Sequence, residues 1–87
     1  MRVNNDGKNI LENKKILSNA KEGDKVRILR YHNNLESKTL LIGMGILPGD
    51  ELEVLSKSVF GSPMYFKHTR SNFFALRKNQ AKFIEIE

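Results

Sequence analysis

The stretch Leu40-Leu41-Ile42-Gly43-Met44-Gly45-Ile46-Leu47-Pro48-Gly49 carries the strongest local signals in the chain. Leu40, Leu41 and Met44 are spaced as one apolar stripe of a helical turn, which we expect to face the strands. Gly45 can adopt the left-handed conformation that ends a helix, so we expect the helix to stop at Met44. Pro48-Gly49 suits the centre of a β-turn, because proline has its φ preset and glycine accepts a positive φ.

Outward from this stretch, short segments with alternating apolar residues predict strands. The five expected strands cover residues 25–31, 50–56, 64–70, 73–76 and 83–87. In the first of them, Val26 and Ile28 alternate with Lys25, Arg27 and Leu29; in the third, Met64, Phe66 and His68 share one face. The helix is expected over residues 35–44, with Asn33 as its cap and Glu36 completing a capping box.

The sequence also predicts the turns and loops that connect these elements. Ser18 is expected to cap a short turn through Lys21, and Gly23-Asp24 to form the turn into the first strand. Residues 57–63 read as a loop with an apolar tip, Ser71-Asn72 as a hairpin turn, and residues 77–81 as one helical turn. Residues 1–15 are polar and form either a flexible extension or a short helix docked by Ile10 and Leu11.

These elements predict a mainly β fold. Short strands at this spacing leave no room for crossover helices between parallel strands, so the pattern favours a small antiparallel barrel. We expect about five strands, with one short helix inserted after the first strand. The barrel domain would cover residues 16–87.

Composition limits the function. The 87 residues make one domain, with a formal net charge of +5 and no cysteine. No apolar run approaches the roughly 20 residues that span a bilayer, and no signal peptide is visible, so we expect a soluble cytoplasmic protein. The scattered basic residues are either a solvated surface or, in part, a patch for an anionic partner.

Catalytic and metal motifs are weak. Gly43-x-Gly45 lacks the residues of a phosphate-binding loop, and no catalytic constellation is visible, so no enzyme is predicted. The acidic residues of the strands are expected to face solvent; they are Glu51, Glu53, Glu85 and Glu87. His32 and His68 are the only weak metal candidates, and they form no ligand motif.

From about Leu17 to Glu87 the chain resembles the FeoA family, small cytoplasmic proteins of bacterial ferrous iron uptake with an SH3-like barrel. The resemblance lies in residues 41–49, which are similar to the family's leucine-rich helix end followed by Gly-x-x-Pro-Gly. It continues in Gly61-Ser62-Pro63, similar to a Gly-Asp-Pro loop, and in residues 74–78, similar to a Leu-Arg end. The chain departs from the family pattern at two positions. Gly43 stands where the family often has a polar or acidic residue, and Ser62 stands where it often has aspartate.

The resemblance implies a non-enzymatic accessory protein that docks on the cytoplasmic GTP-binding part of the membrane ferrous iron transporter. We expect an apolar docking surface with a basic rim, because such surfaces mark interaction sites. The candidate partner-binding residues are Met44, Gly45, Ile46, Leu47, Pro48, Gly49, Val59, Phe60, Gly61 and Pro63. No tightly bound cofactor is expected; a weak Fe²⁺ site and a weak homo-oligomer stay open.

A nucleic-acid module is the main alternative. Small barrels bind nucleic acids by pairing aromatic platforms with a basic groove. Here four aromatic residues interleave with four basic ones: Tyr31, Tyr65, Phe73 and Phe74 with Arg30, Lys67, Arg70 and Arg77. We expect no nucleic-acid partner, since the basic residues are scattered along the chain.

Overall fold

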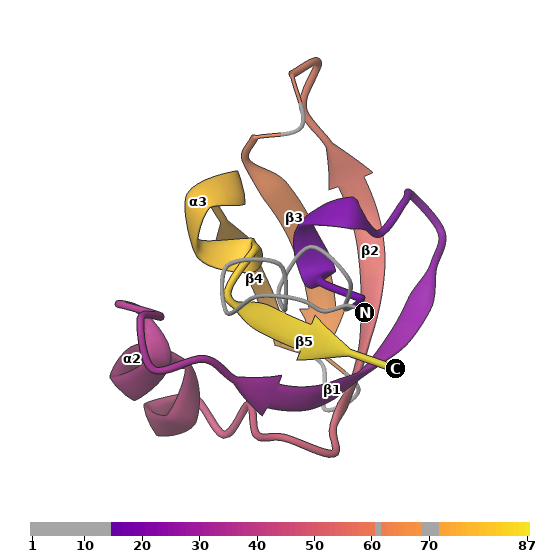
Figure 1. Cartoon of the computed structure of the whole chain (residues 1–87). Coiled ribbons are helices and arrows are strands. Elements are labelled where there is room, and N and C mark those ends of the chain that lie inside the picture. The colour runs from indigo at the N-terminus through magenta and orange to yellow at the C-terminus, as the bar shows by residue number, and fades with distance from the viewer. Residues whose placement is uncertain (1–14, 61, 69–71) are drawn as a thin grey trace, which may run out of the picture.

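In the part of the chain that the structure describes, the fold is a single curled sheet with three short helical segments (Figure 1). The computed structural model describes residues 15–60, 62–68 and 72–87. The elements in chain order are η2 (Leu17–Asn19), β1 (Lys25–Tyr31), α2 (Lys38–Gly43), β2 (Glu51–Lys57), β3 (Met64–His68), β4 (Phe73–Leu76), α3 (Lys78–Ala81) and β5 (Ile84–Ile86). Apart from Lys15, the expected N-terminal extension lies outside the described residues.

All strand pairs are antiparallel, in the order β4-β3-β2-β1-β5. The sheet curls around a core to which every strand contributes, which confirms the mainly β fold expected from the alternation. In β3, Met64, Phe66 and His68 are buried and the two residues between them are exposed, as predicted. The fully buried side chains include Leu17, Ile28, Leu41, Ile46, Leu52, Val54, Met64, Phe66 and Ile84.

Strands β1 and β2 are entered in the same way. Each is preceded by a Gly-Asp pair, Gly23-Asp24 and Gly49-Asp50, in which the glycine has a positive φ. In each turn the aspartate carboxylate accepts a hydrogen bond from the backbone N–H three residues earlier, at 2.8 Å from Lys21 and 3.0 Å from Leu47. The expected turn at Gly23-Asp24 is therefore confirmed.

The two turns also bond reciprocally to the neighbouring strand. The N–H of Gly23 donates to the carbonyl of Val54 and the N–H of Gly49 to that of Ile28, at 2.8 and 2.7 Å. Val26 lies opposite Leu52, between two cross-strand pairs of opposite charge. The β1 and β2 halves are thus related by a local pseudo-twofold axis.

The repeat extends to an irregularity in each strand. The register shifts between Ile28 and Arg30 in β1 and between Val54 and Ser56 in β2. An extra residue in a strand reverses which side chains face inward beyond it. In β1 this brings Tyr31 into the core and leaves Arg30 exposed, which simple alternation would have reversed.

The end of α2 has the geometry of a Schellman motif. Gly45 has φ +81°, its N–H donates to the carbonyl of Ile42, and the N–H of Ile46 donates to that of Leu41. Four residues later Gly49 has φ +96°, and the N–H of Asp50 donates to the carbonyl of Leu47. The helix ends at Gly43 with Met44 as its C-cap, one residue before the expected end at Met44, and the expected left-handed Gly45 and the β-turn at Pro48-Gly49 are confirmed.

The start of α2 differs from the prediction. The helix begins at Lys38 rather than residue 35, and its N-cap residue is Ser37, without a side-chain cap. Asn33 is not the cap, because the helix begins five residues later, at Lys38. In the turn before the helix, Nδ1 of His32 accepts a hydrogen bond from the N–H of Asn34 at 3.2 Å. The N–H and hydroxyl of Ser37 both donate to the side-chain oxygen of Gln80, so a distant contact sets the helix start.

Four local expectations about burial and capping are wrong. Only Leu41 of the expected helical stripe is buried; Met44 is half-buried and Leu40 is exposed. Glu85 is buried rather than solvent-facing, because β5 lies between β1 and a bridge from Ile16, and it forms an ion pair with Arg30 at 3.3 Å. Glu53 is half-buried rather than exposed. Ser18 lies inside η2 and is buried, so it does not cap that turn.

The two neighbouring glycines at the end of α2 provide a matched test of the turn. We expect Gly45→Ala to lower the free energy of unfolding by about 1–2 kcal/mol, because an L-residue is strained at positive φ. A Cβ at Gly45 would meet no atom within 4 Å, so the cost is conformational alone. A Cβ at helical Gly43 would also meet no atom within 4 Å. Gly43→Ala should therefore be neutral or stabilise the protein by up to about 1 kcal/mol. Denaturant unfolding of both variants checks this; equal effects would contradict it.

Candidate docking surface

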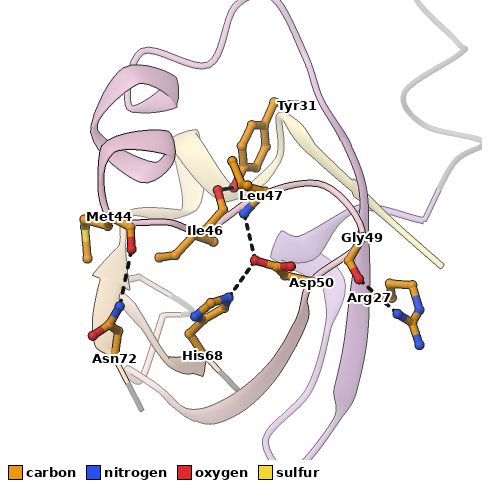
Figure 2. Close-up of polar contacts among 9 residues, drawn as sticks. All are labelled: Arg27, Tyr31, Met44, Ile46, Leu47, Gly49, Asp50, His68 and Asn72. Carbon is orange, nitrogen blue, oxygen red and sulfur yellow. Dashed lines mark hydrogen bonds and ion pairs between the residues drawn. The ribbon is translucent and has the colours of Figure 1, made fainter. Parts of the chain in front are cut away.

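The Asp50 carboxylate holds the connection between α2 and β2 (Figure 2). Its Oδ2 atom lies 3.0 Å from the N–H of Leu47 and 2.8 Å from Nε2 of His68, at the end of β3. A carboxylate only accepts hydrogen bonds, so Nε2 of His68 is the donor. The His68 side chain is 1% exposed, which makes this a bond from the core to the turn.

Three further side chains bond to backbone carbonyls of the same connection (Figure 2). The Tyr31 hydroxyl donates to Ile46, Arg27 Nη1 donates to Gly49 at 2.9 Å, and Asn72 Nδ2 donates to Met44 at 3.3 Å. The donors come from β1 and from the residue before β4. The connection is therefore held against the sheet from both sides.

The Tyr31 phenol lies under the connection and is buried. Burial, together with the negative charge of Asp50, raises the pKa of Tyr31 from 10.0 to about 12. Both causes act in the same direction, since each disfavours the phenolate. The neutral phenol is also the form that donates to the Ile46 carbonyl.

This frame presents apolar side chains to solvent. Leu40 is 64% exposed and Leu47 is 41% exposed, although both belong to well-bonded elements. Leu40 and half-buried Met44 are four residues apart, so they lie on the same side of the helix end. We name Leu40, Met44 and Leu47 the α2-turn surface. Ile42, also exposed, lies on another side of the helix.

The other predicted partner-binding residues differ in exposure. Ile46 is fully buried and belongs to the core, so it cannot contact a partner directly. Pro48 and Gly49 are exposed, and Gly45 is half-buried. At the other predicted segment, Phe60 is exposed and Pro63 is half-buried after a cis peptide bond, while Gly61 lies outside the described residues.

The two predicted segments do not form one surface. Gly49 lies just before β2 and Val59 lies just after it, so the seven-residue strand separates them. At about 3.3 Å per residue, a strand of this length spans roughly 20 Å. Figure 1 shows α2 and the connection between β2 and β3 at opposite ends of the molecule. The expectation of a single docking surface is wrong for this reason.

The two histidines each have a structural partner. His32 stacks on Phe83, with 5.5 Å between ring centroids, and His68 bonds to Asp50. Within residues 15–60, 62–68 and 72–87, no group of three or more His, Cys, Asp or Glu residues is placed to hold a metal ion. In these residues, neither His32 nor His68 is therefore part of a group of potential metal ligands.

Of the four aromatic residues of the nucleic-acid alternative, Tyr31 is set apart, whereas Tyr65, Phe73 and Phe74 line one apolar groove. Tyr31 is buried in the core, and Phe74 is half-buried and stacked on Phe66. Tyr65 and Phe73 are exposed, with the Lys67 ammonium 5.9 Å from the Phe73 ring centroid. Arg70 lies outside the described residues. Of the four expected platforms, Tyr31 is therefore unavailable for stacking on bases.

The residues that fix the site were not singled out by sequence reasoning. The sequence pattern predicts for Asp50 only the start of a strand, and for His68 a place on a buried face or a weak metal site, but no bond between the two. A signal for Asp50 was present, because the pair Gly-Asp occurs before both β1 and β2. No comparable signal points to Arg27, Tyr31 or Asn72, whose bonds join distant segments.

The curled five-stranded antiparallel sheet with a short helix after β1 defines the class of the protein as a small SH3-like barrel. A family model described as the FeoA domain matches residues 15–87. The chain belongs to the FeoA family, a family of small accessory proteins. A search of curated proteins finds no match.

Solved structures agree with this assignment. A FeoA-like protein from Clostridium acetobutylicum is 26% identical with a TM-score of 0.73, and the match covers 85% of each chain. The iron(II) transport protein A from Clostridium thermocellum is 35% identical with a TM-score of 0.72, over 83% of this chain and 44% of that one. A manganese-dependent transcriptional repressor, 17% identical with a TM-score of 0.75 over 86% of this chain and 41% of that one, shares the fold alone.

In the part of the chain that the structure describes, none of the helices has the length and apolar character needed to cross a membrane.

Removing the Tyr31 hydroxyl should change how stability depends on pH. A raised folded-state pKa favours the protonated phenol, so its contribution is complete below pH 10 and is lost as the pH rises towards about 12. Tyr31→Phe should lower the free energy of unfolding by about 1–3 kcal/mol at neutral pH, because the buried Ile46 carbonyl loses its donor.

The measurement is denaturant unfolding of the wild type and of Tyr31→Phe from neutral pH to about pH 12. The difference between wild type and Tyr31→Phe should shrink with rising pH, whereas lysine titration affects both proteins alike. A difference that stays constant to pH 12 would contradict the role of the phenol.

The pseudo-twofold repeat provides a control for Asp50. Asp50→Ala should cost about 2–4 kcal/mol, because it leaves both the Leu47 N–H and the buried His68 ring without their acceptor. Asp24→Ala removes the equivalent turn bond to Lys21 and should cost only about 1 kcal/mol. Equal losses, measured by thermal and denaturant unfolding, would show that the His68 bond contributes nothing.

Proposed function

We propose that this protein is a non-enzymatic accessory protein of ferrous iron uptake that docks, on the cytoplasmic side, on the GTP-binding part of the ferrous iron transporter. Membership of the FeoA family implies involvement in ferrous iron uptake. Two similar structures carry the descriptions iron uptake regulatory protein and iron(II) transport protein A. These descriptions support the proposal at the level of the pathway.

The observation that carries the docking step is the α2-turn surface. Leu40 and Leu47 expose apolar area on or beside the connection between α2 and β2. This connection is bonded to β1 and to the residue before β4 through its backbone carbonyls, and to β3 through the Asp50 carboxylate. Exposed apolar patches mark interaction sites, and binding loses less entropy when the patch is already rigid. A partner would therefore meet a preformed surface.

The charge of the protein suits a steering role. A net charge of +5 speeds the encounter with an acidic face of a partner. The apolar side chains that become buried in the complex supply most of the binding energy. The proposal thus assigns affinity to Leu40, Met44 and Leu47 and encounter rate to the charged surroundings. It requires no catalytic group on this protein.

The test is an NMR titration of the isotope-labelled protein with the isolated GTP-binding domain of the cognate transporter, with and without nucleotide. We expect shifts centred on residues 40–49. Leu47→Ser should weaken binding by at least about tenfold, which is about 1.4 kcal/mol. Leu55→Ser is the matched control, because Leu55 is also 41% exposed but lies on β2 outside this surface, and it should bind as wild type does.

Two results would contradict the proposed surface. One is equal binding by wild type and Leu47→Ser, both folded as judged by their NMR spectra. The other is a set of shifts centred on Val59 and Phe60, which would place the transporter contact at the opposite end of β2.

A further inference from the structure

The connection between β2 and β3 ends in two adjacent large apolar residues that touch little else. Val59 is 92% exposed and Phe60 is 88% exposed. The N–H of Ser58 donates to the carbonyl of Pro63 at 3.1 Å, which closes the base of the connection. Figure 1 shows it projecting beyond the rest of the molecule. We name Val59 and Phe60 the apolar tip.

A basic groove lies against the base of the tip, between η2 and α3. Its polar lining consists mainly of Ser18, Asn19, Ser62, Arg77, Lys78 and Lys82, and no described residue that lines it is acidic. The groove is joined to the tip because the backbone N–H of Lys78 donates to the Ser62 hydroxyl at 3.0 Å. Three cations and several hydroxyl and amide groups make this a surface suited to oxyanions.

Lys57 is not part of this cationic set. Its ammonium donates to the carbonyls of Ser18 and Ala20, at 3.2 and 3.0 Å, and so joins the end of β2 to η2. This bond fixes one wall of the groove relative to the base of the tip. The arrangement of tip and groove is therefore set by the fold.

We propose that this end of the molecule binds the surface of a bilayer containing anionic lipids. Val59 and Phe60 insert into the boundary between headgroups and acyl chains, and Arg77, Lys78 and Lys82 contact lipid phosphates. Stable attachment to a membrane surface takes two weak signals together, an apolar insertion and a basic patch. The structure holds both signals at one end of the chain.

The shape of the tip favours a lipid surface over a protein one. A stable protein interface buries about 800 Å² on each partner, which needs a broad surface with complementary shape. A projecting pair of side chains offers little area to a protein, whereas a bilayer accommodates a convex tip of any outline. The positive groove beside the tip is complementary in charge to anionic headgroups.

The test is flotation of the full chain with vesicles of phosphatidylcholine, pure or containing about one quarter phosphatidylglycerol. We expect binding to the anionic vesicles, and binding weaker by at least about tenfold to the neutral ones. Phe60→Ser should weaken anionic-vesicle binding by a similar factor. Phe73→Ser is the matched control, because Phe73 is 65% exposed on β4, and it should bind as wild type does.

A second pair of variants tests the role of the basic groove. Lys78→Glu should weaken vesicle binding more than Lys25→Glu, which makes the same change in net charge on the exposed face of β1. Equal effects would overturn the role of the groove and leave only a general charge attraction. Absence of flotation with anionic vesicles, or equal binding by wild type and Phe60→Ser, would overturn the proposal. Loss of lipid-free binding to the transporter domain by Phe60→Ser would assign the tip to a protein partner instead.

Discussion

The path of the chain from α2 to β2 depends on the hydrogen bonds of the Asp50 carboxylate. Between Met44 and Asp50 the chain leaves a helix, reverses and enters a strand, and two positive-φ glycines make this possible. Glycine permits such a path but does not select it, because it is equally free in the unfolded chain. The selection comes from Asp50, whose bonds to Leu47 and to buried His68 connect the turn to β3. A single side chain thus links local turn chemistry to the core.

Much of the fold could be predicted from the sequence because its signals are local. Alternation located all five strands to within one or two residues in the described ranges, and the positive-φ positions at Gly45 and Gly49 followed from their neighbours. Three of the misplaced features depend on structure that the local pattern does not show. Tyr31 enters the core through a strand irregularity, Glu85 is buried by a bridge from Ile16, and the start of α2 is set by Gln80.

The candidate site could be predicted only in pieces for the same reason. The exposure of Leu47 and Phe60 agrees with their position in turn and loop, but their separation depends on the length and straightness of β2. Reading the chain in order places them about a dozen residues apart, which says nothing about distance when a strand lies between them. The repeated Gly-Asp pair was the missed signal, because it marks β1 and β2 as equivalent and their turns as similarly built.

The separation of the two exposed apolar regions has a physical meaning beyond geometry. The α2-turn surface adjoins a connection that is bonded to β1, to β3 and to the residue before β4, so it suits a partner with a complementary folded face. The apolar tip is narrow and convex and stands beside cations, so it suits a deformable anionic surface. Because β2 separates the two regions, two partners can occupy them at once without competing for the same area. On the two proposals made above, β2 acts as a spacer, with the transporter contact at one end of the protein and the lipid contact at the other.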